Sequence, residues 1–177
     1  MKEFGSSTGM PWNGKQNILT TVHIYGVTTI GSYSFHSFKK LSSVTLGSST
    51  KNIGSYSFYD CDSLTSITLP LSLTLIYSYA FYSTGITSLS IPSNVNYIYS
   101  NAFYSTPLSS VTTTRTSEPS ICESTAFPTS ITYVDVPIGY SGTDYCSKTP
   151  RTIGGSGTCG SSCNWKYYHH NTTLLIW

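Results

Sequence analysis

A motif of 22 or 23 residues recurs along most of the chain, and it constrains the fold more than any other feature. Three successive copies begin at Leu41, Leu64 and Ile86, so their starts lie 23 and then 22 residues apart. An earlier copy begins at Ile18, and a later one opens at Leu108 before it diverges. Because a unit of this length cannot close its own hydrophobic face, each copy must stack on its neighbours, which predicts a solenoid.

Apolar residues form columns when the copies are aligned. Each copy opens with an aliphatic triplet whose last two members alternate as in a short strand. The triplets are Leu41/Val44/Leu46, Leu64/Ile67/Leu69, Ile86/Leu89/Ile91 and, in a sixth strand motif, Ile131/Val134/Val136. Two further columns hold Ile30, Ile53, Ile76 and Ile98, and Phe35, Phe58, Phe81, Phe103 and Phe127. We expect these columns to form the core.

Glycine and proline mark the bends of each copy. Gly31 and Gly54 directly follow the isoleucine column, which indicates a tight bend there. Pro70, Pro92 and Pro137 directly follow the strand triplets, where a missing N–H ends the strand pairing. The strands are therefore expected to be short.

The repeated pattern L-x-x-V-x-L-P-x-x-V-x-x-I-x-x-x-A-F resembles the BspA-type (Treponema pallidum type) leucine-rich repeat, over roughly Ile18 to Pro137. The resemblance implies a β-rich repeat solenoid, a right-handed leucine-rich-repeat array with about five to six short parallel strands and an irregular convex side. SSTGMPW near the start is similar to the capping segment before such arrays, and GTCGSSCNWKYYHHNTTLLIW at the end to the hairpin that opens the next one. We divide the chain into a partial N-terminal cap (1–17), a solenoid (18–137) and a C-terminal extension (138–177).

The same resemblance supplies an expected biological setting. Members of this family are associated with cell surfaces and with adhesion to host or matrix proteins, so it implies a protein partner and a cell-surface or secreted location. We expect the chain to be a slice of a longer repeat protein whose incompletely capped ends allow self-association. Its start has no apolar signal-peptide region, and no stretch approaches the ~18 consecutive apolar residues of a membrane span.

Charge is scarce and sits toward the ends of the chain. Charged residues make up 9% of the sequence against roughly 25% in ordinary soluble domains, and the net charge of +2 is too small and scattered for a nucleic-acid partner. From Ser63 to Thr114 tyrosine is the only residue that could act as an acid or base. General acid–base catalysis needs a carboxylate or imidazole near working pH, so we expect no enzyme activity and no cofactor.

Small hydroxyl residues occupy the outward strand positions, between the core residues of each triplet. We expect them to form a flat, neutral ladder on the concave side. This candidate binding face consists of Thr21, His23, Ser43, Thr45, Ser66, Thr68, Ser88, Ser90, Ser110 and Thr112. Two interpretations stay open, a partner-binding surface and a soluble β-sheet surface without a ligand.

Tyrosines form a second ladder. Tyr59, Tyr82 and Tyr104 directly follow the core phenylalanine of their copies, and other tyrosines precede it by two residues at Tyr33, Tyr56 and Tyr79. One interpretation is that these rings pack along the edge of the solenoid with wet hydroxyls. The other is an adaptable protein-binding surface rich in Tyr and Ser.

The five cysteines form an odd set. Cys159 and Cys163 precede His169 and His170 at a spacing that does not fit a zinc finger, so no metal site is expected. A disulfide is a candidate for Cys159 with Cys163, and another for Cys122 with Cys146, if the protein is extracellular. Cys61 fills a repeat position typical of a small buried residue.

Asn171, Asp60, Asp62 and two histidines are also considered as functional residues. Asn171 opens an N-glycosylation triplet, Asn-Thr-Thr. Asp60 and Asp62 flank Cys61 and are either weak ligands for a hard cation or part of a solvated loop. His23 and His36 are expected at the surface, because neither has an acidic neighbour in sequence that would orient it for catalysis. We therefore predict a non-enzymatic, protein-binding repeat scaffold, with a purely structural spacer as the alternative.

Overall fold

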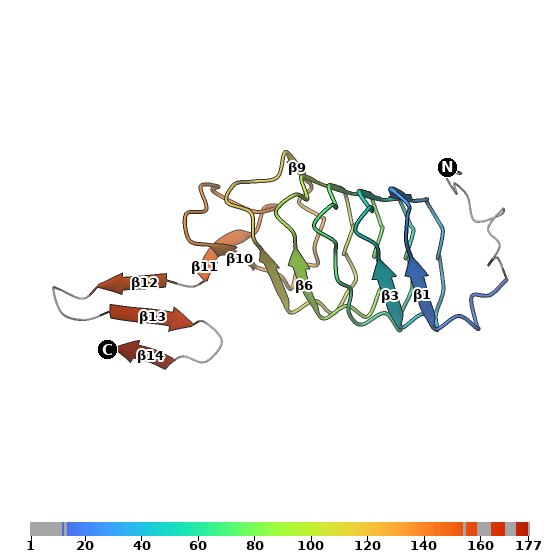
Figure 1. Cartoon of the computed structure of the whole chain (residues 1–177), viewed down its shortest axis with the longest axis horizontal. Helices are drawn as coiled ribbons and strands as arrows, with labels where there is room; N and C mark the ends of the chain where they lie inside the picture. The colour runs from blue at the N-terminus through green and yellow to red at the C-terminus, as the bar shows by residue number, and fades with distance from the viewer. Residues whose placement is uncertain (1–11, 13, 154, 159–163, 169–172, 177) are drawn as a thin grey trace.

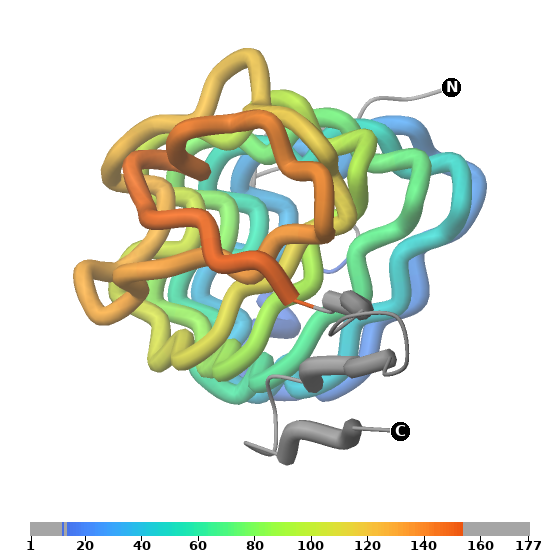
Figure 2. Tube along the Cα trace, turned by 90° about the vertical axis from the view of Figure 1, so that its left-hand side faces the viewer, coloured from blue at the N-terminus to red at the C-terminus, as the bar shows by residue number. Residues whose placement is uncertain are grey.

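The computed structural model is a parallel β-solenoid of about five turns (Figure 1). It describes residues 12, 14–153, 155–158, 164–168 and 173–176. These residues form strands and turns without a helix. Viewed along the long axis, the successive turns overlay one another as coils of similar outline (Figure 2). The array of stacked repeats predicted from the 22- or 23-residue period is therefore confirmed.

The longer strands lie along one side of the solenoid, and we call this series the main ladder. Its strands are β1 (Thr21–Ile24), β3 (Ser43–Leu46), β6 (Ser88–Ile91), β8 (Ser110–Thr113), β10 (Tyr133–Pro137) and β11 (Thr149–Ile153). All pairs are parallel, with β1 beside β3 and with β6, β8, β10 and β11 in a second sheet. Val44 pairs with Val22 and Val111 with Leu89, so the inward residues stack in register as the triplets predicted.

The triplet Leu64/Ile67/Leu69 is predicted to form a strand like the other triplets, but it forms none, although Leu64 and Leu69 are buried. Proline explains the interruption. One turn earlier, the Gly47 N–H donates to the Ile24 carbonyl at 2.8 Å. Pro70 and Pro92 hold the same repeat position on the next two turns, and neither has an N–H to donate. The ladder loses a hydrogen bond on each side of Leu69, and the sheet divides there.

Another parallel sheet, separate from the main ladder, lies after the bend that follows each main-ladder segment. This is the side of the solenoid that we expected to be irregular. Its two-residue strands are β2 (Thr29–Ile30), β4 (Asn52–Ile53), β5 (Leu75–Ile76), β7 (Tyr97–Ile98) and β9 (Ile121–Cys122). The isoleucine column supplies the inward residue of the first four, each of them at most 3% exposed. These strands are too short to show as alternation in the sequence.

The phenylalanine column forms the centre of the core. Its rings stack nearly parallel from turn to turn, with centroids 5.1–5.7 Å apart from Phe35 to Phe127. Trp12, outside the predicted column, extends it by one ring, 5.2 Å from Phe35, and its indole Nε1 donates to the Ser34 carbonyl. The N–H of each of the first four column members, Phe35, Phe58, Phe81 and Phe103, also donates to a carbonyl of the next turn, at 2.7–2.8 Å.

The tight bend lies two residues beyond the glycines that the sequence indicated. Tyr33, Tyr56, Tyr79 and Asn101 adopt φ between 57° and 60°, and the residues four positions later adopt φ between 55° and 60°. Gly54 serves a different purpose, because a Cβ there would lie 2.7 Å from the Ile30 carbonyl oxygen.

Beyond the solenoid, three strands form an antiparallel sheet in the order β12 (Gly155–Thr158), β13 (Asn164–Tyr168) and β14 (Thr173–Ile176). They belong to the segment that we named the C-terminal extension, which also includes β11.

Candidate binding surfaces

The predicted binding face lies along the main ladder. Register pairs Thr21 with Ser43, His23 with Thr45, Ser88 with Ser110 and Ser90 with Thr112, so the hydroxyls form two ranks. The exposed members are Thr21, His23, Ser43, Ser66, Thr68, Ser88 and Ser90, and the half-buried ones are Thr45, Ser110 and Thr112. His23 Nδ1 lies 3.1 Å from Thr45 Oγ1. The face is uncharged over its central turns.

An ion pair between Asp135 and Arg151 lies at the C-terminal edge of this face. The sequence analysis did not predict it. Thr112 is in register with Asp135, and Asp135 with Arg151. The Arg151 Nε donates to Asp135 Oδ1 at 2.6 Å, and its guanidinium lies 3.5 Å above the Tyr133 ring centroid. This hydrogen bond raises the pKa of Arg151. Asp135 occupies an outward position of the sixth strand motif, and a carboxylate at a position that other copies fill with Ser or Thr could have indicated an ion pair.

The predicted tyrosines form two neighbouring columns on the turn side of the solenoid. In the first, Tyr56 stacks on Tyr33 at 4.9 Å and on Tyr79 at 4.8 Å between ring centroids. In the second, Tyr82 lies 5.0 Å from Tyr59 and 6.3 Å from Tyr104. The planes are within 6° of parallel except in the last pair.

Tilted contacts join the columns into one group, which we call the tyrosine cluster (Tyr33, Tyr56, Tyr59, Tyr79, Tyr82 and Tyr104). Tyr56 lies 5.5 Å from Tyr59, and Tyr79 lies 5.5 Å from Tyr82. His36 is half-buried and heads the second column, 4.9 Å from Tyr59. Burial and the neighbouring phenols raise the pKa of Tyr56.

Asp60 and Asp62 hold a lysine. The Lys39 Nζ lies 2.6 Å from Asp60 Oδ2 and 3.0 Å from Asp62 Oδ2, across one turn of the solenoid. The hydrogen bond from Lys39 lowers the pKa of Asp60, and those to both aspartates raise the pKa of Lys39. Among the described residues, no three His, Cys, Asp or Glu side chains gather where they could hold a metal ion.

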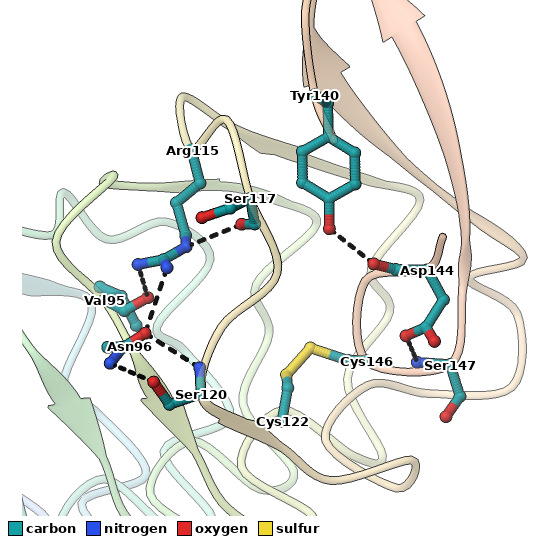
Figure 3. Close-up of a disulfide and its surroundings, with 10 residues drawn as sticks. All are labelled: Val95, Asn96, Arg115, Ser117, Ser120, Cys122, Tyr140, Asp144, Cys146 and Ser147. Atoms are coloured by element: carbon teal, nitrogen blue, oxygen red, sulfur yellow. Dashed lines mark hydrogen bonds between the residues drawn. A yellow bond between two sulfur atoms is a disulfide. The ribbon is translucent and has the colours of Figure 1, made fainter. Parts of the chain in front are cut away.

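Of the two candidate disulfides, the structure contains Cys122–Cys146, whose Cα atoms lie 4.8 Å apart (Figure 3). Cys159, Cys163 and Asn171 lie outside the described residues. Cys61 is a free, fully buried thiol, as its repeat position predicted, and its Sγ donates to the Phe35 carbonyl at 3.1 Å. Burial raises the pKa of this thiol to about 12.

A hydrogen-bond network surrounds the disulfide and joins the last turns (Figure 3). The Arg115 guanidinium donates to the carbonyls of Ser93, Val95 and Ser117 at 2.7–3.1 Å. Glu118 Oε1 accepts from the backbone N–H groups of Thr143 and Asp144, which lower the pKa of Glu118. These contacts were not foreseen, because the loop that carries Arg115 lies where the repeat pattern diverges.

At the opposite end of the solenoid, a cavity of about 400 Å³ lies beside the first turn. Apolar residues dominate its lining, among them Trp12, Leu19, Val22, Ile30 and Phe35. These include the first members of the core columns. Self-association through the ends of the solenoid stays a prediction.

A solenoid of short parallel strands, with a core of repeated aliphatic residues and an outward face of small polar strand residues, defines a leucine-rich-repeat protein. Six copies of the BspA type leucine rich repeat region match residues 15–137. The chain belongs to this family. The resemblance found in the repeat pattern is confirmed.

Two solved structures share the fold. A leucine-rich repeat protein from Bacteroides ovatus is 25% identical, with a TM-score of 0.57 over 73% of this chain and 35% of that one. The pneumococcal vaccine antigen PcpA is 20% identical, with a TM-score of 0.57 over 75% of this chain and 41% of that one. The chain thus spans well under half the length of either structure. Among curated proteins there was no match.

Within the described residues, no helix has the length and apolar character needed to cross a bilayer.

Proposed function

We propose that this chain is a non-enzymatic, protein-binding segment of a cell-surface protein, and that its partner lies on the main-ladder face. The observation that carries the proposal is the row of exposed, uncharged hydroxyls at Ser43, Ser66, Thr68, Ser88 and Ser90. Solenoids commonly bind partners on extended faces of this kind, where each turn adds a similar increment of contact. The neutral centre provides neither an acid–base pair nor an electrostatic patch, which favours recognition by shape and hydrogen bonds.

A surface location is supported by two independent observations. BspA-type repeats are associated with cell surfaces, and the partner class that this suggests is a host or matrix protein. The Cys122–Cys146 disulfide is of the kind that persists in oxidising environments outside the cytosol. Both fit a secreted or surface-exposed repeat array better than a cytosolic protein.

Lysine substitutions on the face test the binding proposal. Thr45→Lys, Thr68→Lys and Ser90→Lys together add long, charged side chains to three successive turns and should abolish binding to extracellular-matrix proteins and cultured host cells. The matched control adds the same charge to exposed positions that follow these three segments, with Ser48→Lys, Leu71→Lys and Ser93→Lys. Binding that survives the first triple variant, or is lost equally in the control, would exclude this face.

The alternative is a structural spacer without a ligand of its own. The regular repeat spacing and the stacked core serve a spacer as well as a scaffold. The isolated 177-residue chain distinguishes the two when it is tested against the same matrix proteins and host cells. A spacer binds none of them, and the lysine substitutions leave its stability unchanged.

A further inference from the structure

The tyrosine cluster is a second candidate site, distinct from the main-ladder face. We propose that the tyrosine cluster is a site of oxidative cross-linking, in which two of its four central phenols, Tyr56, Tyr59, Tyr79 and Tyr82, join as dityrosine within one chain. The co-reactants are a peroxide and a haem peroxidase, or another one-electron oxidant of the same class. The bond joins neighbouring turns or the two columns of one turn.

Proximity is the first argument. Tyr56 lies 4.8–5.5 Å from three other tyrosine rings, and Tyr82 lies 5.0–6.3 Å from three. Radical coupling requires two phenoxyl rings to meet, and groups held side by side react as if at very high local concentration. Elsewhere in the described solenoid, Tyr77 and Tyr99 form a separate stacked pair at 5.6 Å. The cluster differs because each central ring has several tyrosine neighbours.

Backbone conformation is the second argument. Tyr33, Tyr56 and Tyr79 hold φ near 60°, a left-handed conformation that disfavours bulky side chains. Asn101 takes the same place on the following turn, and asparagine is a residue that this conformation favours. Because the fold accepts Asn there, the backbone does not require tyrosine. The three tyrosines hold this disfavoured backbone conformation while their rings stack on one another at 4.8–4.9 Å.

The chemistry balances with a peroxide as oxidant. Each of two tyrosines loses one electron and its phenolic proton, which gives two phenoxyl radicals. Their spin density at the ring carbons ortho to oxygen allows a C–C bond to form there. Each joined carbon then gives up its hydrogen, which returns to the phenol oxygen of the same ring. The two electrons and two protons released reduce one hydrogen peroxide to two water molecules.

The tyrosine cluster is accessible to an oxidant, and a cross-link there would stabilise the solenoid. The cluster rings are half-buried or, for Tyr33, 41% exposed, so oxidising equivalents reach them from solvent. The disulfide at the end of the array already indicates an oxidising environment. Each turn of a solenoid contacts only its neighbours. A bond between turns would therefore restrain local unfolding that the stacked core alone permits.

The experiment treats the full 177-residue chain with horseradish peroxidase and hydrogen peroxide. Dityrosine fluorescence, intact mass and cross-linked peptide mapping are the readouts. The expected product is a monomer on a denaturing gel that has lost two hydrogens, with its cross-link among the four central tyrosines. Tyr56→Phe, Tyr59→Phe, Tyr79→Phe and Tyr82→Phe together keep the stacked rings but remove the phenols, and should abolish most of the product.

A matched variant carries the same number of changes at tyrosines outside the cluster: Tyr25→Phe, Tyr77→Phe, Tyr99→Phe and Tyr133→Phe. It should yield as much product as the wild type. Cross-links mapped to Tyr77 and Tyr99, products joined only between chains, or no dityrosine in the folded wild type would each overturn the proposal. Mapping on the wild type decides the matter even if the first variant does not fold. Partner binding plays no part in this assay, so its result is independent of the proposed function.

Discussion

At the residue scale, the position before the core phenylalanine holds serines and alanines whose contributions to stability differ. The residue before each core phenylalanine is Ser34, Ser57, Ala80, Ala102 and Ala126 on successive turns, and all five are buried. Ser34 Oγ donates to the Gly31 carbonyl at 2.7 Å, whereas Ser57 Oγ is buried and makes no hydrogen bond within the described residues. A buried hydroxyl without a partner loses its hydration and gains nothing in return.

We therefore predict that Ser57→Ala stabilises the protein by about 1–2 kcal/mol in the free energy of unfolding. Urea denaturation measures the change. Ser34→Ala is the matched control and should destabilise by about 1 kcal/mol, because it removes a satisfied hydrogen bond. Equal effects of the two substitutions would show that Ser57 has a partner in solution.

The phenylalanine column gives the converse prediction. Phe81 is fully buried and stacks on Phe58 at 5.3 Å and on Phe103 at 5.1 Å. Phe81→Ala should cost about 3–5 kcal/mol, because it removes buried surface and leaves a cavity in the middle of the array. Leu71→Ala, at a position 74% exposed, should cost less than about 0.5 kcal/mol. A loss below about 1 kcal/mol for Phe81→Ala would contradict the central place of this column.

At the element scale, the two ends of the main ladder are organised differently. The first strands, β1 and β3, form a two-stranded sheet of their own, which ends before Leu69, where Pro70 and Pro92 each remove a ladder bond. At the C-terminal end, side chains connect the loop between β10 and β11 to earlier turns: Cys146 bonds Cys122, and Glu118 accepts from the N–H groups of Thr143 and Asp144. Covalent and charged contacts thus compensate where the repeat pattern fades.

Reduction of this disulfide should loosen the last turns first. It spans 24 residues, and a loop of that size corresponds to about 3.5 kcal/mol of stabilisation in the chain-entropy model. Hydrogen exchange in β10 and β11 should therefore speed up under reductant, while exchange in β4 and β5 stays slow. The double variant Cys122→Ser/Cys146→Ser should exchange fast in this region with or without reductant. A further response of that variant to reductant would assign the effect to other cysteines.

At the whole-molecule scale, burial of weak acids makes the fold sensitive to alkali. Burial raises the pKa values of Cys61, Tyr140 and Tyr145 to about 12 each, above the ordinary 9.0 for the thiol and 10.0 for the phenols. The unfolded chain therefore releases these protons at lower pH than the folded one. The stabilisation is complete below about pH 9 and is lost as the pH rises toward about 12.

We predict that the urea midpoint falls progressively above about pH 9. Tyr145→Phe, which keeps the buried ring and removes its proton, should show a shallower fall than the wild type between about pH 10 and pH 12. Identical pH profiles for the two proteins would show that Tyr145 ionises in the folded state as readily as in the unfolded one.

The uncharged centre of the molecule sets how binding responds to salt. No charged residue lies between Ser63 and Thr114, so an interface over these turns has little Coulombic attraction to screen. Affinity for a matrix protein bound on the main-ladder face should change by less than about twofold between 50 and 500 mM NaCl, given how weakly salt acts on neutral contacts. A steep decline measured by biolayer interferometry would place the contact on the charged ends, at Lys39 or Arg151.

Sequence periodicity by itself determined the solenoid, its core columns and the positions of both the hydroxyl face and the tyrosines. It could do so because burial repeats with the turn, and each inward position such as Ile53 or Phe58 faces its equivalents on neighbouring turns. Only the tertiary structure decided which ladder bonds form beside Pro70 and Pro92, that Cys122 pairs with Cys146, and that Arg151 meets Asp135. These contacts depend on the distance and direction between particular atoms of different turns, and a one-dimensional pattern does not encode those quantities.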